Sequence, residues 1–243
     1  MAYPAGYATY HNYVIHKHMM KTELENIGFT TVESIYSERE IEEILKILNE
    51  KEISGQFGVR EFLFKNPEIR SKIFNKRLKE IVKQISPKCT NSIKSIYFDK
   101  PPNSNWIVNW HQDLTINLSY RKEVDQYKNW RETKERTVVQ PNRELLENIF
   151  TIRIHLDKCT KQNGALRVIE ESHLKGTIDT TEWIKTKVGK ETICEVGKGG
   201  ILIMKPLLLH SSRRTENDLN RSCLLYTSPS PRDLSTSRMP SSA

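Results

Sequence analysis

The chain has 243 residues, of which 37% are hydrophobic and 28% are charged, and its formal net charge is +8. A chain of this length is typical of one domain with a sizeable core. It contains no apolar run of about 18 residues, the length that a membrane-spanning helix needs, and its N-terminus lacks the apolar core of a signal peptide. Lysine and arginine are interleaved with glutamate and form no basic stripe with aromatic residues, so neither a membrane nor a nucleic-acid partner is expected.

The charge and the cysteines set two further expectations. A basic protein has a mild preference for an anionic small-molecule substrate. The four cysteines, Cys89, Cys159, Cys194 and Cys223, are scattered and form no CxxC pair. We therefore expect reduced, partly buried thiols in a cytoplasmic protein.

The two ends of the chain differ in composition from the rest. Residues 1–19 are rich in Tyr and His and contain no acidic residue, and residues 226–243 are rich in Ser and Pro without a hydrophobic period. We expect both ends to be disordered or non-native extensions. The C-terminal one has the composition expected of foreign sequence joined to the end of a truncated gene. The remainder, residues 20–225, is expected to be a single domain with N-terminal helices.

Two segments near the start of this domain have helical periodicity. Ser37 and Glu40 form a capping-box pattern, and the apolar residues that follow recur at helical spacing, which predicts a helix over residues 38–50. A second segment opens with an Asn-Pro pair, which suits a cap and a first helical turn. Its apolar stripe predicts another helix, over residues 66–85.

From residue 92 the hydrophobic period becomes that of β-strands. Short apolar or alternating runs, separated by Gly, Pro and Asn turn signals, predict strands over residues 92–100, 113–119, 150–158, 164–172, 191–196 and 200–212. The stretch 120–143 is long, charged and poorly periodic, which is typical of a lid loop. Many short strands after two helices predict a mainly β fold with flanking α-helices, either a sandwich or a barrel.

The segment WHQD places His111 and Asp113 two positions apart. In a strand, such residues point to one face with Cα atoms about 6.5–7 Å apart, so an imidazole and a carboxylate could reach the same cation. This pair alone is weak support for a metal site, and a third ligand must come from a distant segment. The other histidines of the domain are His155, His173 and His210.

His210 is the strongest candidate for the third ligand. It closes the most apolar predicted strand, where a histidine is often only a hydrogen-bonded core residue, but Ser212 and Arg221 follow it at useful spacings. Two histidines and a carboxylate would make the facial triad of non-haem iron(II) oxygenases, which leaves positions open for an oxo-acid and dioxygen. Arg221 and Ser212 could hold the far carboxylate of that acid. His155 is an alternative ligand, and His173 is expected to have a structural hydrogen-bonding role.

These segments resemble the phytanoyl-CoA dioxygenase family over about residues 22–223. The resemblance lies in WHQD, QNGALRVIEESH and GGILIMKPLLLHSS, with an arginine beyond them. It implies a double-stranded β-helix, which is a cupin-like jelly roll, and an iron(II)- and 2-oxoglutarate-dependent dioxygenase. By this resemblance the iron ligands are His111, Asp113 and His210, and the 2-oxoglutarate-binding residues are Arg221, Ser212 and Arg153.

The predicted strand over residues 150–158 supports the resemblance independently. Thr151, Arg153 and His155 alternate along it with aliphatic residues. In a closed jelly roll, the polar face could line a wet interior while the aliphatic face packs outward on the helices. The alternative is that Arg153 is a solvated surface residue.

The resemblance implies a reaction in which dioxygen and 2-oxoglutarate are consumed, a small organic substrate is hydroxylated, and succinate and carbon dioxide are released. Related halogenating enzymes lack the carboxylate ligand, so the presence of Asp113 indicates hydroxylation or a related oxidation. A cupin-like metalloenzyme that needs no oxo-acid is an alternative. The sequence predicts neither the substrate, nor the carbon oxidised, nor the oligomeric state.

A non-catalytic scaffold with the same fold is the alternative from another class. In the family, a further strand follows the anchoring arginine and closes the major sheet. Here the Ser- and Pro-rich segment begins shortly after Arg221. If that strand is missing, unpaired backbone groups would be exposed beside the pocket, and the chain could be inactive.

Overall fold

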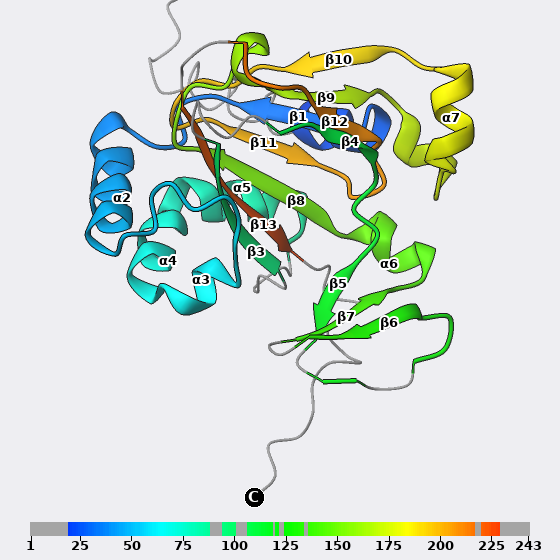
Figure 1. Cartoon of the computed structure of the whole chain (residues 1–243), viewed down its shortest axis with the longest axis horizontal. Coiled ribbons are helices and arrows are strands. Elements are labelled where there is room, and N and C mark those ends of the chain that lie inside the picture. Colours follow the sequence, from blue (N-terminus) through cyan, green and yellow to red (C-terminus); the bar gives the residue numbers. More distant parts are fainter. Residues whose placement is uncertain are drawn as a thin grey trace, which may run out of the picture.

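The computed structural model describes residues 19–87, 94–100, 106–118, 120–121, 124–133, 136–216 and 220–228. Two antiparallel sheets lie against each other, helices cover the outer face of the larger one, and a small third sheet projects from one end (Figure 1). The larger sheet has the strand order β1-β11-β8-β13-β3-β2. Its strands are β1 (Phe29–Val32), β11 (Ile201–Met204), β8 (Phe150–His155), β13 (Arg221–Ser228), β3 (Lys94–Lys100) and β2 (Val59–Arg60).

The second main sheet has the strand order β10-β9-β12-β4. Its strands are β10 (Glu191–Cys194), β9 (Leu166–Ile169), β12 (His210–Ser212) and β4 (Val108–His111). From β8 to β13 the chain passes repeatedly from one main sheet to the other, which is the winding of a double-stranded β-helix. The predicted mainly β jelly roll is therefore confirmed. The small sheet contains β5 (Ile116–Leu118), β7 (Thr137–Gln140) and β6 (Lys128–Glu132).

Helices lie at the start of the described chain and in the connections between strands. Residues 19–26 are helical. The α-helices that follow are α2 (Glu38–Glu50), α3 (Phe62–Lys65), α4 (Pro67–Ile73), α5 (Lys76–Ile85), α6 (Arg143–Asn148) and α7 (Thr180–Thr186). Two 3₁₀ helices are η1 (Lys161–Asn163) and η2 (Ser172–Lys175).

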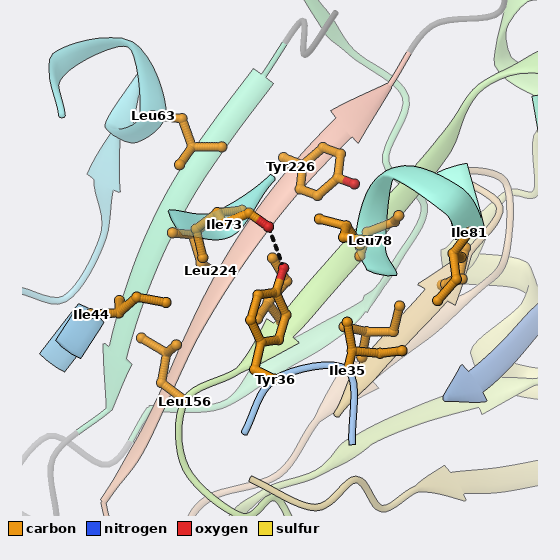
Figure 2. Close-up of a cluster of buried hydrophobic side chains, with 14 of the residues drawn as sticks. Ile35, Tyr36, Ile44, Leu63, Ile73, Leu78, Ile81, Leu156, Leu224 and Tyr226 are labelled. Atoms are coloured by element: carbon orange, nitrogen blue, oxygen red, sulfur yellow. Dashed lines mark hydrogen bonds between the residues drawn. The ribbon is translucent and has the colours of Figure 1, made fainter. Parts of the chain in front are cut away.

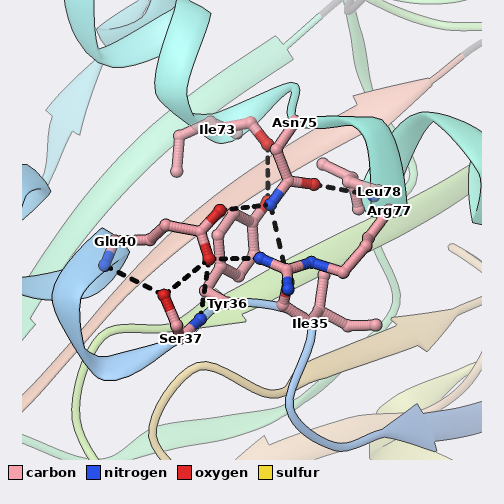
Figure 3. A network of polar contacts seen from close by, with 8 residues as sticks. All are labelled: Ile35, Tyr36, Ser37, Glu40, Ile73, Asn75, Arg77 and Leu78. Carbon is pink, nitrogen blue, oxygen red and sulfur yellow. Dashed lines mark hydrogen bonds and ion pairs between the residues drawn. The ribbon is translucent and has the colours of Figure 1, made fainter.

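Helix α2 begins and ends where the sequence predicts. The Ser37 side chain accepts a hydrogen bond from the Glu40 backbone, and the Glu40 carboxylate accepts one from the Ser37 backbone at 2.8 Å. The same carboxylate receives hydrogen bonds from Arg77 and, at 3.2 Å, from Asn75 (Figure 3). The capping box thus also joins α2 to the start of α5.

The predicted single helix over residues 66–85 is wrong at its centre. Helix α4 ends at Ile73, and α5 begins after Asn75, whose side chain accepts a hydrogen bond from the Leu78 backbone. Asn75 is extended, with φ −66° and ψ 173°, as an N-cap requires. The hydroxyl of Tyr36 donates to the freed carbonyl of Ile73 at 2.6 Å. The apolar stripe continues across the break, which is why periodicity alone does not detect it.

The main core lies between helices α2–α5 and the outer face of the larger sheet (Figure 2). Ile152 and Ile154 of β8 and Tyr226 of β13 are fully buried against helical residues such as Ile44 and Leu78. Burial of each such side chain contributes about 1.5–3 kcal/mol. The aliphatic face of β8 therefore packs outward on the helices, as predicted, and Thr151, Arg153 and His155 face the other way.

The predicted single strand over residues 200–212 is also wrong. Residues 201–204 form β11 in the larger sheet, whereas residues 210–212 form β12 in the other sheet. A turn at Lys205–Leu209 separates them, closed by a hydrogen bond from the Leu208 backbone to the Lys205 carbonyl at 3.0 Å. Both strands and the turn are buried, so the apolar run is continuous in sequence although the backbone changes sheets.

The stretch 120–143, predicted as a lid loop, contains two strands. In its described part, β6 and β7 pair with each other, and β7 pairs with β5. Val139 of β7 packs with Leu146 of α6 in a separate hydrophobic cluster. The segment is therefore a supported sheet at one end of the jelly roll.

The expectation that the closing strand is missing is wrong, because β13 is present in the larger sheet. This strand pairs with β3 over residues 221–227 and with β8 over residues 223–228, so it lies inside the larger sheet and leaves no edge open beside Arg221. Residues 226–228, which were assigned to the C-terminal extension, belong to this strand and are buried. Residues 1–18 and 229–243 lie outside the described residues.

Two expectations from composition concern cysteines and membrane spans. Cys159, Cys194 and Cys223 are free and buried, and Cys89 lies outside the described residues. Within the described chain, no helix has the length and apolar character needed to cross a bilayer.

Candidate metal centre

The HxD pair and His210 meet where β4 and β12 pair. His111 ends β4 and lies directly opposite His210, which begins β12, and their ring centroids are 4.2 Å apart. Asp113 follows just beyond β4, where its backbone N–H donates to the carbonyl of Pro206 at 2.9 Å. One ligand atom from each of these three side chains lies within 4.8 Å of the other two. The structure thus brings together the three predicted iron ligands.

The hydrogen bonds of the two histidines leave the same ring atom available on each. Nδ1 of His111 lies 2.7 Å from the carbonyl of Asn109, and Nδ1 of His210 lies 2.8 Å from the carbonyl of Leu208. A carbonyl oxygen can only accept, so each Nδ1 carries the proton and each Nε2 presents a lone pair. Such second hydrogen bonds orient histidine ligands toward a metal ion.

The charge states of the buried pair also suit a metal ion. Burial raises the pKa of Asp113, but Lys94 together with the two histidines outweighs it, so the pKa is lowered and the carboxylate is ionised. Nζ of Lys94 is 3.8 Å from Oδ1 of Asp113. Burial lowers the pKa of His210, so its imidazole is neutral. One carboxylate oxygen and two imidazole Nε2 atoms on one side of a cation fit divalent iron and leave other positions open.

Gln112 links the segments that carry the ligands. It lies directly after the end of β4, between His111 and Asp113, and is buried. Its amide nitrogen donates to the carbonyls of Leu207 at 2.6 Å and of Gly176 at 2.8 Å, and its amide oxygen accepts from the Ile178 backbone at 2.8 Å. The Gln112 side chain therefore connects the HxD segment to the turn at Lys205–Leu209, which precedes His210.

The interior next to this centre contains polar atoms without a protein partner. Among the described residues, buried atoms that lack a hydrogen bond include Nε of Arg153, both ring nitrogens of His155, Oγ of Ser212 and Nε of Arg221. Buried polar groups are nearly always hydrogen-bonded in native proteins. Three of these residues, Arg153, Ser212 and Arg221, are the ones predicted to bind the cosubstrate, so their unpartnered atoms are free to bond a polar ligand.

This interior is cationic. Arg221 lies opposite Lys100 across β13 and β3, and its guanidinium donates to the carbonyl of Gly164. Arg153 lies over the ring of Phe98, with Cζ 5.8 Å from the centroid. In the described part of the chain, no carboxylate oxygen lies within 4.0 Å of the side-chain nitrogens of these three basic residues. An acid with two carboxylates would compensate these charges.

The other two histidines do not join the metal cluster. Burial, together with Arg153 and Arg221, lowers the pKa of His155 to about 3, so its ring is neutral. His173 is buried, and its Nε2 is 3.0 Å from the carbonyl of Glu25. A structural role for His173 agrees with this contact.

Two lysines near the site, Lys94 and Lys100, are not marked by any motif in the sequence. Both lie on the face of β3 that also carries Phe98, and so point toward the interior. Strand alternation predicts that they share a face. It does not predict which strand lies beside them or which ligand they could contact, because the pairing of β3 with β13 joins distant segments.

The fold and these side chains define a jelly-roll protein in which two histidines and one carboxylate, at the paired ends of β4 and β12, could hold a metal ion. The chain belongs to the phytanoyl-CoA dioxygenase family, whose model matches residues 24–223. This match agrees with the resemblance carried by the HxD segment and its partners. Comparison with curated proteins gives no match.

Solved structures with the same fold include three that illustrate the range of relatives. EvdMO1 superposes with a TM-score of 0.67 at 15% identity, over 88% of this chain, which spans half of the EvdMO1 chain. The non-haem α-ketoglutarate-dependent carbocyclase SnoK from nogalamycin biosynthesis has a TM-score of 0.66 at 15% identity, with 91% of this chain and 90% of SnoK covered. EctD from S. alaskensis, solved with 2-oxoglutarate and 5-hydroxyectoine, has a TM-score of 0.67 at 13% identity, with 88% and 76% covered. Identities this low establish the shared fold alone.

Proposed function

We propose that the protein is an iron(II)- and 2-oxoglutarate-dependent dioxygenase that hydroxylates a small organic substrate. The observation that supports this most directly is the convergence of His111, Asp113 and His210 within 4.8 Å, next to a cationic interior whose buried polar atoms lack protein partners. Membership of the dioxygenase family supports the same reaction class. The relatives solved with 2-oxoglutarate support the choice of oxo-acid.

In this proposal, each residue has a defined task. Nε2 of His111, Nε2 of His210 and one oxygen of Asp113 hold iron(II), and Arg221 with Ser212 binds the distal carboxylate of 2-oxoglutarate. When bound, iron(II) and 2-oxoglutarate use dioxygen to oxidise the substrate, and succinate and carbon dioxide are released. The protein keeps both histidines in the tautomer that binds metal.

Arg153 is the third residue that we propose for the cosubstrate site. It is placed on the inner face of β8 next to His155 and opposite Leu225 of β13. We propose that its guanidinium lines the cosubstrate pocket, where its unpartnered Nε can donate to an oxygen of the bound acid. The solvated alternative for Arg153 has less support, because that nitrogen is buried.

The substrate is proposed to be a small molecule with an anionic group. Lys94 lies beside Asp113 at the end of the interior farther from Arg221, so a negative group on the substrate would be favoured there. The names of similar structures include a carbocyclase and an epimerase as well as a 5-hydroxyectoine complex, so hydroxylation is the specific part of the proposal. Three free, buried cysteines support a reducing, cytoplasmic location.

The test is an anaerobic titration of the purified full chain with iron(II) and then with 2-oxoglutarate. Chelation of iron by the oxo-acid is expected to produce a visible charge-transfer absorption that saturates at one equivalent of each. A screen of small organic acids for succinate release, with the product mass increased by one oxygen atom, then identifies the substrate. Absence of the absorption band, or turnover that does not depend on 2-oxoglutarate, would reject the proposal.

A further inference from the structure

Lys100 is a fully buried lysine, and among the described residues no acid lies within ion-pair distance of it. It ends β3, is 1% exposed, and points into the interior beside Arg221, its cross-strand neighbour on β13. Residues directly opposite on antiparallel strands have Cβ atoms about 4.5–5.5 Å apart. Two cationic side chains are thus buried next to each other, which is unfavourable unless an anion joins them.

The hydrogen bonds of Lys100 would fully satisfy a neutral amine and leave an ammonium one acceptor short. Its Nζ donates to the carbonyl of Trp106 at 2.7 Å and to the carbonyl of Arg213 at 2.9 Å. A neutral amine has two N–H groups, and both are satisfied by these carbonyls, whereas an ammonium has a third proton that needs another acceptor. The Trp106 ring, with its centroid 5.3 Å from Nζ, is only a weak partner for that proton.

Gly164 lies close to both Arg221 and Lys100. Its carbonyl accepts a hydrogen bond from the Arg221 guanidinium, and a β-carbon built on Gly164 would lie 3.5 Å from Nζ of Lys100. The same β-carbon would lie 2.8 Å from the Arg213 carbonyl, and Gly164 has φ +80°, so only glycine fits here. The distal carboxylate proposed to bind Arg221 would therefore arrive close to Lys100.

We propose that Lys100 is a proton-linked charge partner of the cosubstrate site: where the Lys100 amine is neutral, the arrival of the distal carboxylate of 2-oxoglutarate at Arg221 draws a proton from solvent onto Nζ of Lys100. The amine lone pair accepts this proton and no other bond changes. This inference rests on the proposed function, because it requires 2-oxoglutarate to bind at Arg221.

The charged and titratable groups around Lys100 support this coupling. Burial, Arg221 of β13 and Arg214 of the segment after β12 lower the pKa of Lys100, Cys159 opposes them, and the net result is a pKa of about 8. A carboxylate placed among these groups would raise the pKa again, because an opposite charge favours the ammonium. Affinity for 2-oxoglutarate should then be full below pH 8 and should fall as pH rises above it.

The test is calorimetric titration of the iron(II)-loaded full chain with 2-oxoglutarate, without oxygen, in buffers of different ionisation enthalpy. At pH 8 the wild type is expected to take up about half a proton per molecule bound, because a group with this pKa is then half protonated. At pH 6.5 the uptake should be close to zero. The probe 2-oxovalerate has the same chelating end but no distal carboxylate, and it should cause no uptake at either pH.

Three variants separate proton linkage from a purely structural role. Lys100→Met should bind 2-oxoglutarate at least about tenfold more weakly at pH 7, the loss typical of a charge-assisted hydrogen bond, and without proton uptake. Lys100→Arg should keep the affinity but lose the uptake, because arginine stays protonated. Lys158→Met, which replaces an exposed lysine, should retain the wild-type uptake. If Lys100→Met does not fold, the comparison of the wild type with Lys100→Arg still decides the question.

Two results would overturn the inference while leaving the proposed function intact. One is wild-type binding of 2-oxoglutarate at pH 8 with no dependence on the buffer. The other is proton uptake that persists in Lys100→Arg or Lys100→Met. A wild type that does not bind 2-oxoglutarate at all would instead overturn the proposed function, and this inference with it.

Discussion

His111 and His210 are direct partners in the β4–β12 pairing, and their rings lie 4.2 Å apart at an angle of 51°. The register of this pair shifts between His210 and Ser212. Such irregularities re-aim side chains next to active sites. The metal centre therefore depends on strand register, since a slip of one residue would turn either imidazole to the opposite face.

Removal of one proposed ligand should abolish iron binding. In His210→Ala the remaining imidazole and carboxylate hold the ion too weakly, and we expect affinity to fall by more than about 100-fold, since loss of even an outer partner costs about 10–100-fold. The measurement is iron per protein after anaerobic loading and desalting. Ser211→Ala is the matched control, because Ser211 bonds Arg167 on the other face of the same strand. Full iron retention in His210→Ala would contradict the ligand assignment.

Arg221→Met should weaken the binding of 2-oxoglutarate without affecting the binding of iron. A hydrogen bond to a charged group contributes about 1.5–3 kcal/mol, so the apparent Kd for 2-oxoglutarate should rise about 10–100-fold. Ser212→Ala removes a neutral donor and should raise it by about 2–10-fold. Both are measured by absorbance titration of the iron-loaded protein. Binding of 2-oxovalerate should be unchanged in either variant, and an equal loss for both acids would argue against a distal-carboxylate site.

Gln112→Ala should destabilise the segments that carry the proposed ligands, although Gln112 is not itself a proposed ligand. The variant leaves two carbonyls and one N–H without their partner, and one unsatisfied buried group costs about 1–3 kcal/mol. We expect a lower free energy of unfolding in urea and faster iron loss to a chelator. Gln162→Ala, at an exposed position, is the control. If Gln112→Ala matches this control in both assays, the linking role of Gln112 is wrong.

The contacts of Glu40 should make the free energy of unfolding depend on pH in the acidic range. Burial raises the pKa of Glu40, but hydrogen bonds from Ser37, Arg77 and Asn75 outweigh it and lower the pKa from 4.5 to about 2. A pKa depressed in the folded state stabilises the protein above the unfolded value, and this stability is lost as pH falls toward the folded value. The difference in unfolding free energy between the wild type and Glu40→Gln should therefore be largest above pH 4.5 and shrink toward pH 2.

Urea unfolding at pH 6 and pH 3 measures this difference. Glu42→Gln on the same helix is the control, because Glu42 is exposed, so its small effect should not change with pH. A Glu40→Gln effect that is constant over this range would show that the network in Figure 3 does not hold the carboxylate ionised.

The parts of the site that were predictable follow from local alternation. His111 and Asp113 could be placed on one side because they are two positions apart, and Thr151, Arg153 and His155 alternate with aliphatic residues in the same way. Ser37 and Glu40 gave the start of α2 from a four-residue pattern. In each case the relevant physics acts between near neighbours in the chain.

The parts that were missed depend on competition or on long-range pairing. At Asn75 one helix has ended and a cap begins the next, but the apolar stripe continues across the break and is the stronger pattern. At Lys205 the chain changes sheets within an apolar run that is buried throughout, so no change of period marks the turn. The proximity of Lys100 to Arg221 depends on the register of β3 with β13, which no local pattern specifies.

The place of β13 between β8 and β3 has a consequence for biosynthesis. This strand is the last of the described chain to leave the ribosome, yet both halves of the larger sheet hydrogen-bond to it and not to each other. The two histidines can pair on the nascent chain before that strand emerges, but the arginine for the oxo-acid cannot be in place. Maturation should thus pass through a species that can capture metal before it can engage its cosubstrate, with two unpaired strand edges that chaperones would recognise.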